Sequence, residues 1–316
     1  MVSAASPPGA VPYFPVQLTA PDIAPWLAGN TGIPGVTTLQ GALPGPHVAL
    51  LALLHGNEVA GAIALDELLR AGVQPARGRL SLVFANISAY GRFDADQPTA
   101  SRFLDEDMNR VWDPAVLDGP RCSSELARAR AIRPVIDQAD LLLDLHSMLW
   151  PSDPLLLCGP GARGRALGMV LGVPNLVVAD RGHATGPRLI DYPRFTAPDG
   201  TAAACLVEAG QHWRFETVDV LRACVYAMLG HAGMVPAPQQ RPAPRCAEVT
   251  VAITAATSAF TFVQPYRGGD VIPERNTLIA LDGQTEIRTP HDDTLLIMPS
   301  LLASRGHTAV RMARFL

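Results

Sequence analysis

Two histidines and two glutamates stand where apolar segments of the chain end. His55 and Glu58 are three positions apart after one apolar run, His146 ends a second run, and Glu208 ends a third. Two histidines, one glutamate and a water molecule form a standard catalytic zinc site. His55, Glu58 and His146 are therefore candidate ligands of Zn²⁺, which would lower the pKa of a bound water molecule to about 7. Gly56 would let the backbone bend sharply between the first two ligands.

These side chains must be positioned by a buried sheet. Short apolar runs recur and lack in-out alternation, which is typical of strands covered on both faces. The expected strands span 47–55, 79–86, 139–146, 154–159, 175–180 and 203–210. In an open α/β sheet, ligands bind beyond the carboxyl ends of the strands, so the candidate ligands are expected to meet there.

Helical patterns lie between the expected strands and predict an α/β fold with helices on both faces of the sheet. The expected helices span 59–71, 124–138, 161–171 and 217–230. We expect Gly72 and Gly172 to end the first and third helices, and Thr217 to cap the fourth. Pro134 is expected to interrupt or restart the second helix.

The C-terminal part of the chain has a different character. The stretch "PAPQQRPAPR" (236–245) is rich in proline and is typical of an extended linker. Beyond it, residues 248–263 and 277–290 alternate in hydropathy between turn signals, which predicts antiparallel strands. The sequence thus predicts a catalytic domain at 1–235, a linker, and a small β-rich C-terminal domain at 246–316.

Composition excludes several classes of protein. The 316 residues are 48% hydrophobic and 17% charged, which indicates a globular protein. A net charge of −4 gives no electrostatic reason to expect nucleic acid or a membrane surface as a partner. Five cysteines without a C-x-x-C pair favour reduced thiols, and no signal peptide or long apolar run is evident. We therefore expect a cytoplasmic protein that is neither exported nor inserted in a membrane.

Five short motifs occur in a fixed order and carry a resemblance to a known family. They are "HGNE" (55–58), "RFL" (102–104), "DMNR" (107–110), "DLH" (144–146) and "EAG" (208–210). Over about residues 47 to 212, the chain resembles the succinylglutamate desuccinylase and aspartoacylase family of zinc hydrolases, relatives of the zinc carboxypeptidases. The resemblance implies a zinc-carboxypeptidase-like mixed sheet with helices on both faces, followed by a small β-rich C-terminal domain.

The resemblance also implies roles for individual residues. Asp107 matches the carboxylate that orients the first zinc histidine, and Arg102 matches the arginine that polarises the acyl carbonyl. Asn109 and Arg110 match the pair that grips the carboxylate of the amino-acid product, for which a guanidinium offers two parallel donors. Glu208 matches the general base, which takes a proton from water and hands it to the leaving amine.

Other positions match the family less closely. Asp144, two residues before a candidate ligand, is either a second carboxylate supporting the metal site or an ordinary buried aspartate. Either Arg188 or Arg194 could be the further substrate arginine that precedes the general base. His307 stands near the place where the C-terminal domain of the family lends a tyrosine to the pocket. Three further histidines lack a ligand-like context and are expected to be structural or exposed: His183, His212 and His231.

Together the motifs imply a zinc-dependent amidohydrolase that cleaves an N-acyl amino acid, with this small molecule as its expected partner and a homo-oligomer as a further possibility. Relatives often form homo-oligomers, although nothing in the sequence identifies an interface. One alternative is a zinc carboxypeptidase that acts on short peptides, which a cleft narrowed by the C-terminal domain would disfavour. Another is a non-catalytic zinc or ligand-binding protein, which would need neither Glu208 nor Arg102.

Overall fold

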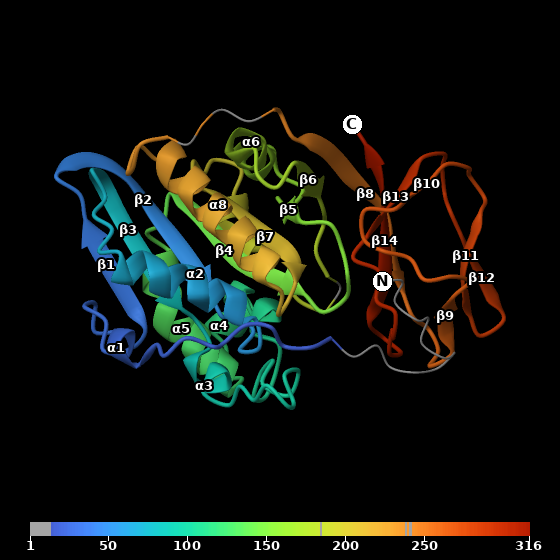
Figure 1. Cartoon of the computed structure of the whole chain (residues 1–316), viewed down its shortest axis with the longest axis horizontal. Coiled ribbons are helices and arrows are strands. Elements are labelled where there is room, and N and C mark those ends of the chain that lie inside the picture. The colour runs from blue at the N-terminus through green and yellow to red at the C-terminus, as the bar shows by residue number, and fades with distance from the viewer. Residues whose placement is uncertain (1–13, 184, 238, 240–241) are drawn as a thin grey trace.

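The computed structural model describes residues 14–183, 185–237, 239 and 242–316. Within them the chain forms a mixed sheet of eleven strands in the order β1-β3-β2-β4-β7-β5-β6-β8-β14-β13-β10 (Figure 1). The first seven strands are β1 (Val36–Gln40), β2 (Leu43–Ala52), β3 (Arg77–Phe84), β4 (Leu141–Met148), β5 (Leu155–Leu157), β6 (Leu176–Ala179) and β7 (Ala203–Gln211). All six segments expected to be strands are confirmed, whereas the edge strand β1 was not predicted.

The centre of the sheet is parallel. β2 pairs in parallel with β3 on one side and with β4 on the other, and β4 pairs in parallel with β7. The register of β4 and β7 places His146 directly opposite Glu208. Two of the candidate functional residues are therefore positioned by backbone pairing alone.

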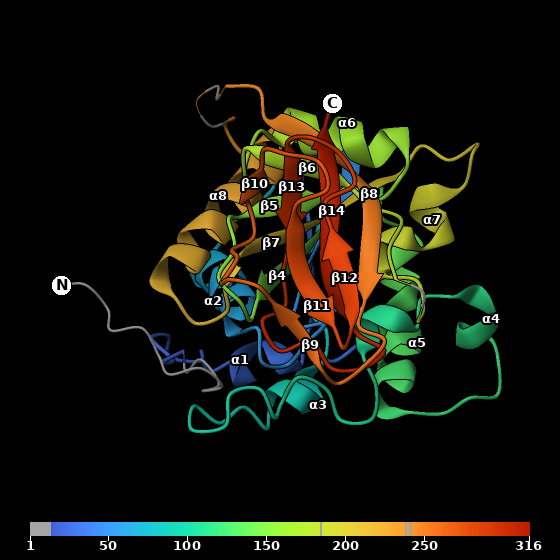
Figure 2. The same cartoon turned by 90° about the vertical axis from the view of Figure 1, so that its right-hand side faces the viewer.

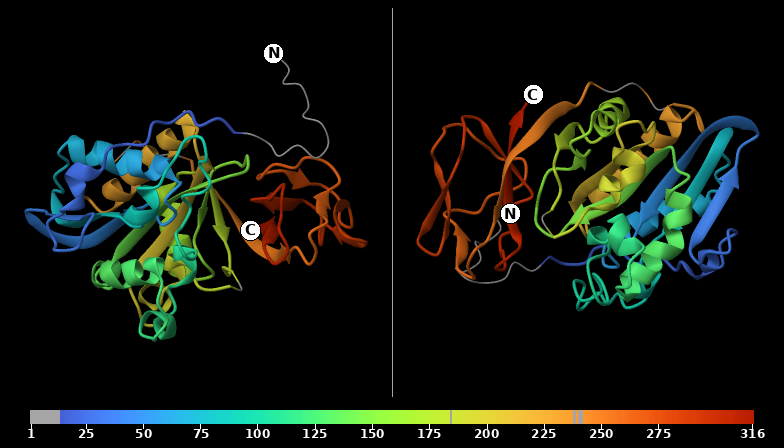
Figure 3. Two further views of the ribbon diagram at one scale, coloured as in Figure 1. Left: turned by 90° about the horizontal axis from the view of Figure 1, so that it is seen from below. Right: turned by 180° about the vertical axis from the view of Figure 1, so that it is seen from behind.

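Helices cover both faces of the sheet, as predicted. On one face, α2 (Val59–Arg70), α6 (Ala162–Leu171) and α8 (Phe215–His231) share an apolar core with alternate residues of β2, such as Leu50. On the other face, α5 (Ser124–Ile136) packs against residues of the opposite parity, such as Leu51, and it comes to the front when the molecule is viewed from behind (Figure 3). Short elements connect these layers: α1 (Ala24–Leu27), α3 (Ile87–Tyr90), η1 (Met108–Arg110), α4 (Pro114–Leu117), η2 (Leu189–Asp191) and α7 (Pro193–Thr196).

The ends of the helices confirm two expectations and correct two others. Gly72 and Gly172 adopt left-handed φ angles of 64° and 65° just after α2 and α6. Pro134 lies inside α5 without interrupting it, because the helix ends only two residues later and loses little by the missing N–H. Thr217 is not the cap of α8, which begins at Phe215; instead its hydroxyl donates to the carbonyl of Gln211 and fastens the helix to the end of β7.

Antiparallel strands are present in both predicted stretches, 248–263 and 277–290, and one of them continues the main sheet together with three strands outside these stretches. β8 (Arg245–Thr254) pairs in parallel with β6 and antiparallel with β14 (Thr308–Phe315), followed by β13 (Thr294–Ile297) and β10 (Val271–Ile272). β9 (Phe260–Phe262), β11 (Leu278–Asp282) and β12 (Thr285–Arg288) form a separate three-stranded sheet (Figure 2). This β-rich region has its own apolar core, which includes Leu296 and Met312.

The division into 1–235, 236–245 and 246–316 remains a prediction. β8 begins at the last residue of the expected linker and is hydrogen-bonded to β6. Residues 1–13 of the expected first domain, and residues 238 and 240–241 of the expected linker, lie outside the described part of the chain. Among the described helices, none is both long and apolar enough to cross a membrane.

Candidate metal centre and active site

His55, Glu58 and His146 form a buried cluster at the carboxyl edge of the central strands. Oε1 of Glu58 lies 2.7 Å from Nδ1 of His55, and Oε2 lies 3.1 Å from Nδ1 of His146. One potential ligand atom from each residue lies within 4.8 Å of those of the other two. Both imidazoles thus turn the same nitrogen toward one carboxylate, an arrangement that can hold a metal ion.

Local backbone geometry brings the first two residues of this cluster together. His55 lies in the turn after β2, and Glu58 immediately precedes α2. Gly56 between them does not have a positive φ, so its role differs from the predicted sharp bend. A Cβ at this position would lie only 2.5 Å from backbone atoms of Ser101 and Tyr90. Its amide also donates to the carbonyl of Arg102. The lack of a side chain therefore allows the segment that carries His55 to pack directly against the segment that carries Arg102.

Each histidine has a second carboxylate on its other ring nitrogen. Nε2 of His55 lies 3.0 Å from Oδ1 of Asp107, which also accepts the backbone N–H of Asn109 at the start of η1. Nε2 of His146 lies 2.9 Å from Oδ2 of Asp144, although these atoms are not aligned for a hydrogen bond. Carboxylates in this position fix the ring orientation of metal-binding histidines.

The electrostatics of the cluster also suit a cation. Burial by itself would raise the pKa of Glu58, but His146 and His55 together hold it well below its usual value. Burial would likewise lower the pKa of His146, and the neighbouring Asp144 and Glu58 raise it well above the usual value instead. Three carboxylates, of which Glu58 and Asp144 are buried and Asp107 is partly buried, thus surround two imidazoles. A bound proton or a metal ion would balance this excess of negative charge.

The buried polar atoms of the site support the metal interpretation. Within the described residues, both carboxylate oxygens of Asp144, Nε2 of His146 and Oε2 of Glu208 have no hydrogen-bond partner. Unpaired buried polar atoms cost free energy and are uncommon unless a site binds something. The donor set of two imidazoles and one carboxylate fits a divalent ion such as Zn²⁺.

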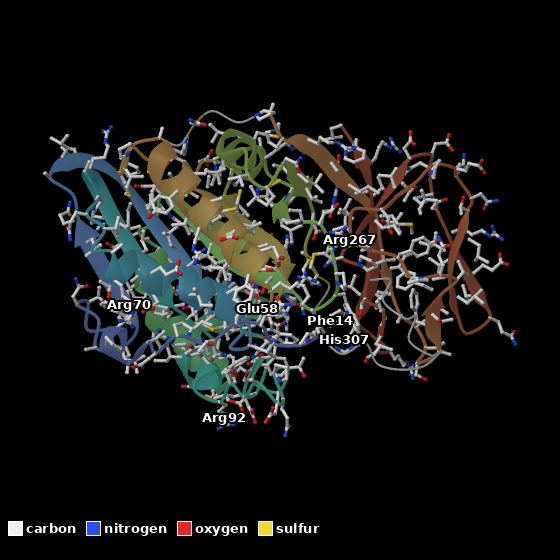
Figure 4. The ribbon with its side chains drawn as sticks, in the orientation of Figure 1. Phe14, Glu58, Arg70, Arg92, Arg267 and His307 are labelled. Carbon is white, nitrogen blue, oxygen red and sulfur yellow. The ribbon has the colours of Figure 1, made fainter. Side chains whose placement is uncertain are left out.

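A cavity of about 790 Å³ opens beside this cluster. Its lining includes the candidate ligands and most of the other predicted site residues, namely Arg102, Asp107, Asn109, Arg110, Arg188, Glu208 and His307. Glu58 and His307, which are labelled in Figure 4, come from the N-terminal and C-terminal parts of the chain and line the same cavity. The described C-terminal strands therefore contribute directly to the candidate site.

Arg102 and Glu208 reach the metal cluster from different elements. The Arg102 guanidinium is partly exposed, and its NH2 lies 2.9 Å from Nε2 of His55 and 3.3 Å from Oδ2 of Asp107. Glu208 lies in the second half of β7, where burial raises the pKa of its carboxyl group to about 8. The charge of Glu58 adds to this effect, and His146 opposes it. A partly exposed guanidinium and a carboxylate with a raised pKa thus face the same cavity.

Asn109 and Arg110 are fixed by the backbone around η1. Oδ1 of Asn109 accepts the backbone N–H of Leu189, which leaves its amide N–H groups as donors. NH1 of Arg110 donates to the carbonyl of Asn109, and its NH2 lies 3.9 Å from Asp107. These contacts hold both side chains in the wall of the cavity.

The structure distinguishes Arg188 from Arg194, the two candidates for the further substrate arginine. Arg188 is buried, lines the cavity and forms ion pairs with Asp180 and Asp191. Arg194 is not part of the lining; it donates to the carbonyl of Ala139 and pairs with Asp140 before β4. The prediction that Arg194 could contact substrate is therefore not supported by its location.

Sequence reasoning missed three of the basic side chains that line the cavity. Arg311 of β14 is only 4% exposed, and His183 and His212, which were expected to be structural or exposed, also face this space. His212 has a structural contact as well, because Nδ1 lies 2.7 Å from the hydroxyl of Ser147. Only His231 is exposed as expected. The one available signal was an arginine inside the apolar run "AVRMA" of the last strand.

A mixed α/β sheet with a buried His-Glu-His cluster at its carboxyl edge defines the class of this protein as an α/β protein with a candidate metal centre. The sequence model of the Succinylglutamate desuccinylase/Aspartoacylase catalytic domain matches residues 44–231. The chain therefore belongs to this family, and the resemblance seen in the five motifs is confirmed.

Solved structures show the same fold. Succinylglutamate desuccinylase from Vibrio cholerae is 19% identical, with a TM-score of 0.69 over 89% of this chain and 85% of that one. A succinylglutamate desuccinylase/aspartoacylase from Rhodobacter sphaeroides is 19% identical, with a TM-score of 0.67 over 89% and 88%. The ectoine utilization protein EutE (DoeB) from Ruegeria pomeroyi, solved with bound product, is 19% identical, with a TM-score of 0.64 over 89% and 88%. No curated protein sequence matches significantly.

Proposed function

We propose that this protein is a zinc-dependent amidohydrolase that cleaves the amide bond of an N-acyl amino acid. The observation that carries the proposal is the shared cavity: Glu208 and Arg102 line the same space as the buried cluster of His55, Glu58 and His146. A protein that only bound a metal would need neither a buried carboxylate nor an arginine in that place. Membership of a family named for desuccinylases and aspartoacylases supports the same reaction class.

The three clustered residues would hold the metal ion. When bound, Zn²⁺ would supply the charge that makes water a nucleophile at neutral pH and polarises the acyl carbonyl. Asp107 and Asp144, next to Nε2 of the two histidines, would keep the rings in the orientation that the ion needs. Replacing any of the three ligands is expected to abolish stoichiometric metal binding.

Glu208 is the proposed general base and acid. Its carboxylate is buried beside the cluster, and its Oε2 has no partner among the described groups, which leaves this atom available to a water molecule. Burial raises its pKa, so it accepts a proton more readily than an exposed glutamate does. The same oxygen can then deliver that proton to the nitrogen of the leaving amine.

Arg102 and the residues of η1 would position the substrate. The Arg102 guanidinium lies next to the metal cluster and can stabilise negative charge that develops on the acyl oxygen. Asn109 and Arg110, with donors held in the cavity wall, can bind the free carboxylate of the amino-acid half. The amide bond would then lie between this carboxylate and the metal.

An assay of purified protein loaded with Zn²⁺ tests the proposal. N-acetyl, N-formyl and N-succinyl amino acids should release free amino acid, and removal of the metal by a chelator should stop the reaction. Short peptides serve as the comparison because a carboxypeptidase would use the same ligands. Turnover of peptides alone would replace the proposed substrate class by a carboxypeptidase activity.

A further inference from the structure

Arg311 lines the cavity from β14, the last strand of the chain, whereas the five sequence motifs all lie before residue 211. It is 4% exposed, and its strand β14 is hydrogen-bonded between β8 and β13 in the interior of the sheet. It lines the same cavity as the candidate metal ligands. We propose that Arg311 binds a carboxylate of the substrate, an inference that rests on the proposed function for the identity of that substrate.

The charge of Arg311 is only partly balanced by its neighbours. Its Nε lies 3.2 Å from Oδ2 of Asp180 but makes no hydrogen bond within the described residues. The same oxygen lies 3.0 Å from NH1 of Arg188, so two buried guanidinium groups share one carboxylate oxygen. Arg188 has a second ion pair, with Asp191, whereas Asp180 is the one described carboxylate within ion-pair distance of Arg311. The charge of Glu208 also acts on Arg311, but without an ion pair. A buried cation in this situation is stabilised by an anion that enters the cavity.

His183 holds the Arg311 side chain without balancing its charge. NH2 of Arg311 lies 2.8 Å from Nε2 and 3.2 Å from Nδ1 of this histidine. Burial lowers the pKa of His183 to about 2, and the nearby Arg311 and Arg110 contribute to this effect. The ring is therefore neutral at physiological pH and acts as a positioning residue for the guanidinium.

The surrounding electrostatics make this end of the cavity a site for anions. Burial lowers the pKa of Arg110 to about 10, and the charges of Arg102, Arg188 and Arg311 act in the same direction. Burial and the charge of Arg188 also lower the pKa of Arg311. The charged forms of Arg110 and Arg311 are thus disfavoured by burial and by neighbouring guanidinium groups, and a carboxylate bound beside them would relieve that repulsion. A charged substrate is favoured there over a neutral one of the same shape.

Calorimetric binding to the zinc-loaded protein tests the inference without requiring turnover. The probes are N-acetylglutamate and the uncharged N-acetylglutaminamide, which have nearly the same shape. We expect Arg311→Met to raise the Kd of N-acetylglutamate by about 10- to 100-fold, because a charge-assisted hydrogen bond is lost. Binding of N-acetylglutaminamide should stay within about 2-fold of its original value, since it has no carboxylate to contact the guanidinium.

Two further variants keep the test decisive. Arg314→Met removes an exposed arginine from the same strand and should leave both affinities unchanged. Should Arg311→Met not fold, Arg311→Lys takes its place, because it retains the charge but loses the planar pair of donors. It should raise the Kd of N-acetylglutamate several-fold and leave the Kd of the neutral probe unchanged. An equal loss for both probes, or no loss for either, would overturn the inference.

The outcome can be separated from that of the proposed function. If no N-acyl amino acid is hydrolysed but the charged probe still depends on Arg311, the proposed reaction fails and the carboxylate site stands. If hydrolysis occurs and Arg311→Met leaves KM unchanged, the reaction stands and the role of Arg311 fails. Where both are correct, KM should rise while kcat changes little, because the contact is made equally in the ground and transition states.

Discussion

Nε2 of His55 lies 3.0 Å from Oδ1 of Asp107, and that same oxygen accepts the backbone N–H of Asn109. One carboxylate thus orients a candidate metal ligand and begins the short helix that carries the proposed carboxylate-binding residues. The placement of the metal site and the placement of the substrate are coupled through Asp107.

Replacing Asp107 should therefore weaken metal binding without emptying the site. For Asp107→Asn we expect the zinc affinity to fall about 10- to 100-fold, because the His55 ring loses its charged partner. Competition with a chelating dye measures this affinity. Asp113→Asn, which removes a comparable carboxylate cap from α4, is the matched control and should bind zinc normally. An unchanged affinity in Asp107→Asn would contradict the orienting role.

Glu208→Gln should separate catalysis from metal binding. The amide keeps the size of the side chain but cannot take up a proton, so we expect kcat to fall by about 10²- to 10⁴-fold. Metal content, measured by elemental analysis, should remain at one ion per chain. Glu216→Gln alters an exposed glutamate in the first turn of α8 and should be fully active. Unchanged turnover in Glu208→Gln would remove this residue from the mechanism.

Gly56→Ala should damage both stability and metal binding. A Cβ at this position would lie 2.5 Å from backbone atoms at the end of α3 and at Ser101, which cannot yield as a flexible side chain could. We expect a loss of roughly 1–3 kcal/mol in the free energy of unfolding, measured by denaturant titration. Gly72→Ala meets no neighbouring atom but has a φ of 64°, so it reports backbone strain alone. Wild-type stability and zinc binding in Gly56→Ala would refute this account of the loop contact.

His212 should make the metal-free protein sensitive to mild acid. Burial lowers the pKa of its imidazole from 6.5 to about 4, so the unfolded chain takes up a proton in this pH window while the folded chain does not. The contribution of His212 to stability is therefore complete above pH 6.5 and is lost as the pH falls toward 4, at up to ~1.4 kcal/mol per pH unit.

Denaturant titrations in the presence of a chelator at several pH values measure this dependence. His212→Gln removes the titrating group, so its stability should decline less steeply between pH 6.5 and 4 than that of the unaltered protein. His231→Gln changes an exposed histidine at the end of α8, and the pH dependence of its stability should match that of the unaltered protein. Parallel pH profiles for all three proteins would show that His212 is not buried in its neutral form.

Much of the framework was predictable because its physical signals are local. A run such as "LLLDL" in β4 is apolar on both faces, so it indicates a covered strand without any tertiary information. β1 was missed because only Val36 in this short edge strand is fully buried. The predictions for Pro134 and Thr217 were wrong because each effect depends on the folded structure. The effect of Pro134 depends on its distance from the end of α5, and that of Thr217 on the nearby carbonyl of Gln211.

The candidate site was predictable only where its residues fall in short motifs. His55, Glu58 and Asp107 could be found from spacing and resemblance. Arg311 and His183 could not, because they are 128 positions apart and meet only through the arrangement of β14 against the loop after β6. Their contact is a property of the folded chain and leaves no pattern in either segment alone.

The pairing of β6 with β8 joins the N-terminal and C-terminal strands into one continuous hydrogen-bonded sheet. The distance between the candidate metal ligand His146 on β4 and Arg311 on β14 is therefore set by the spacing of the strands, and the proline-rich stretch before β8 does not determine it. The walls of the cavity are therefore fixed by the sheet. A substrate of the proposed kind would be selected by its length and by the placement of its charges, without closure of one half of the molecule on the other.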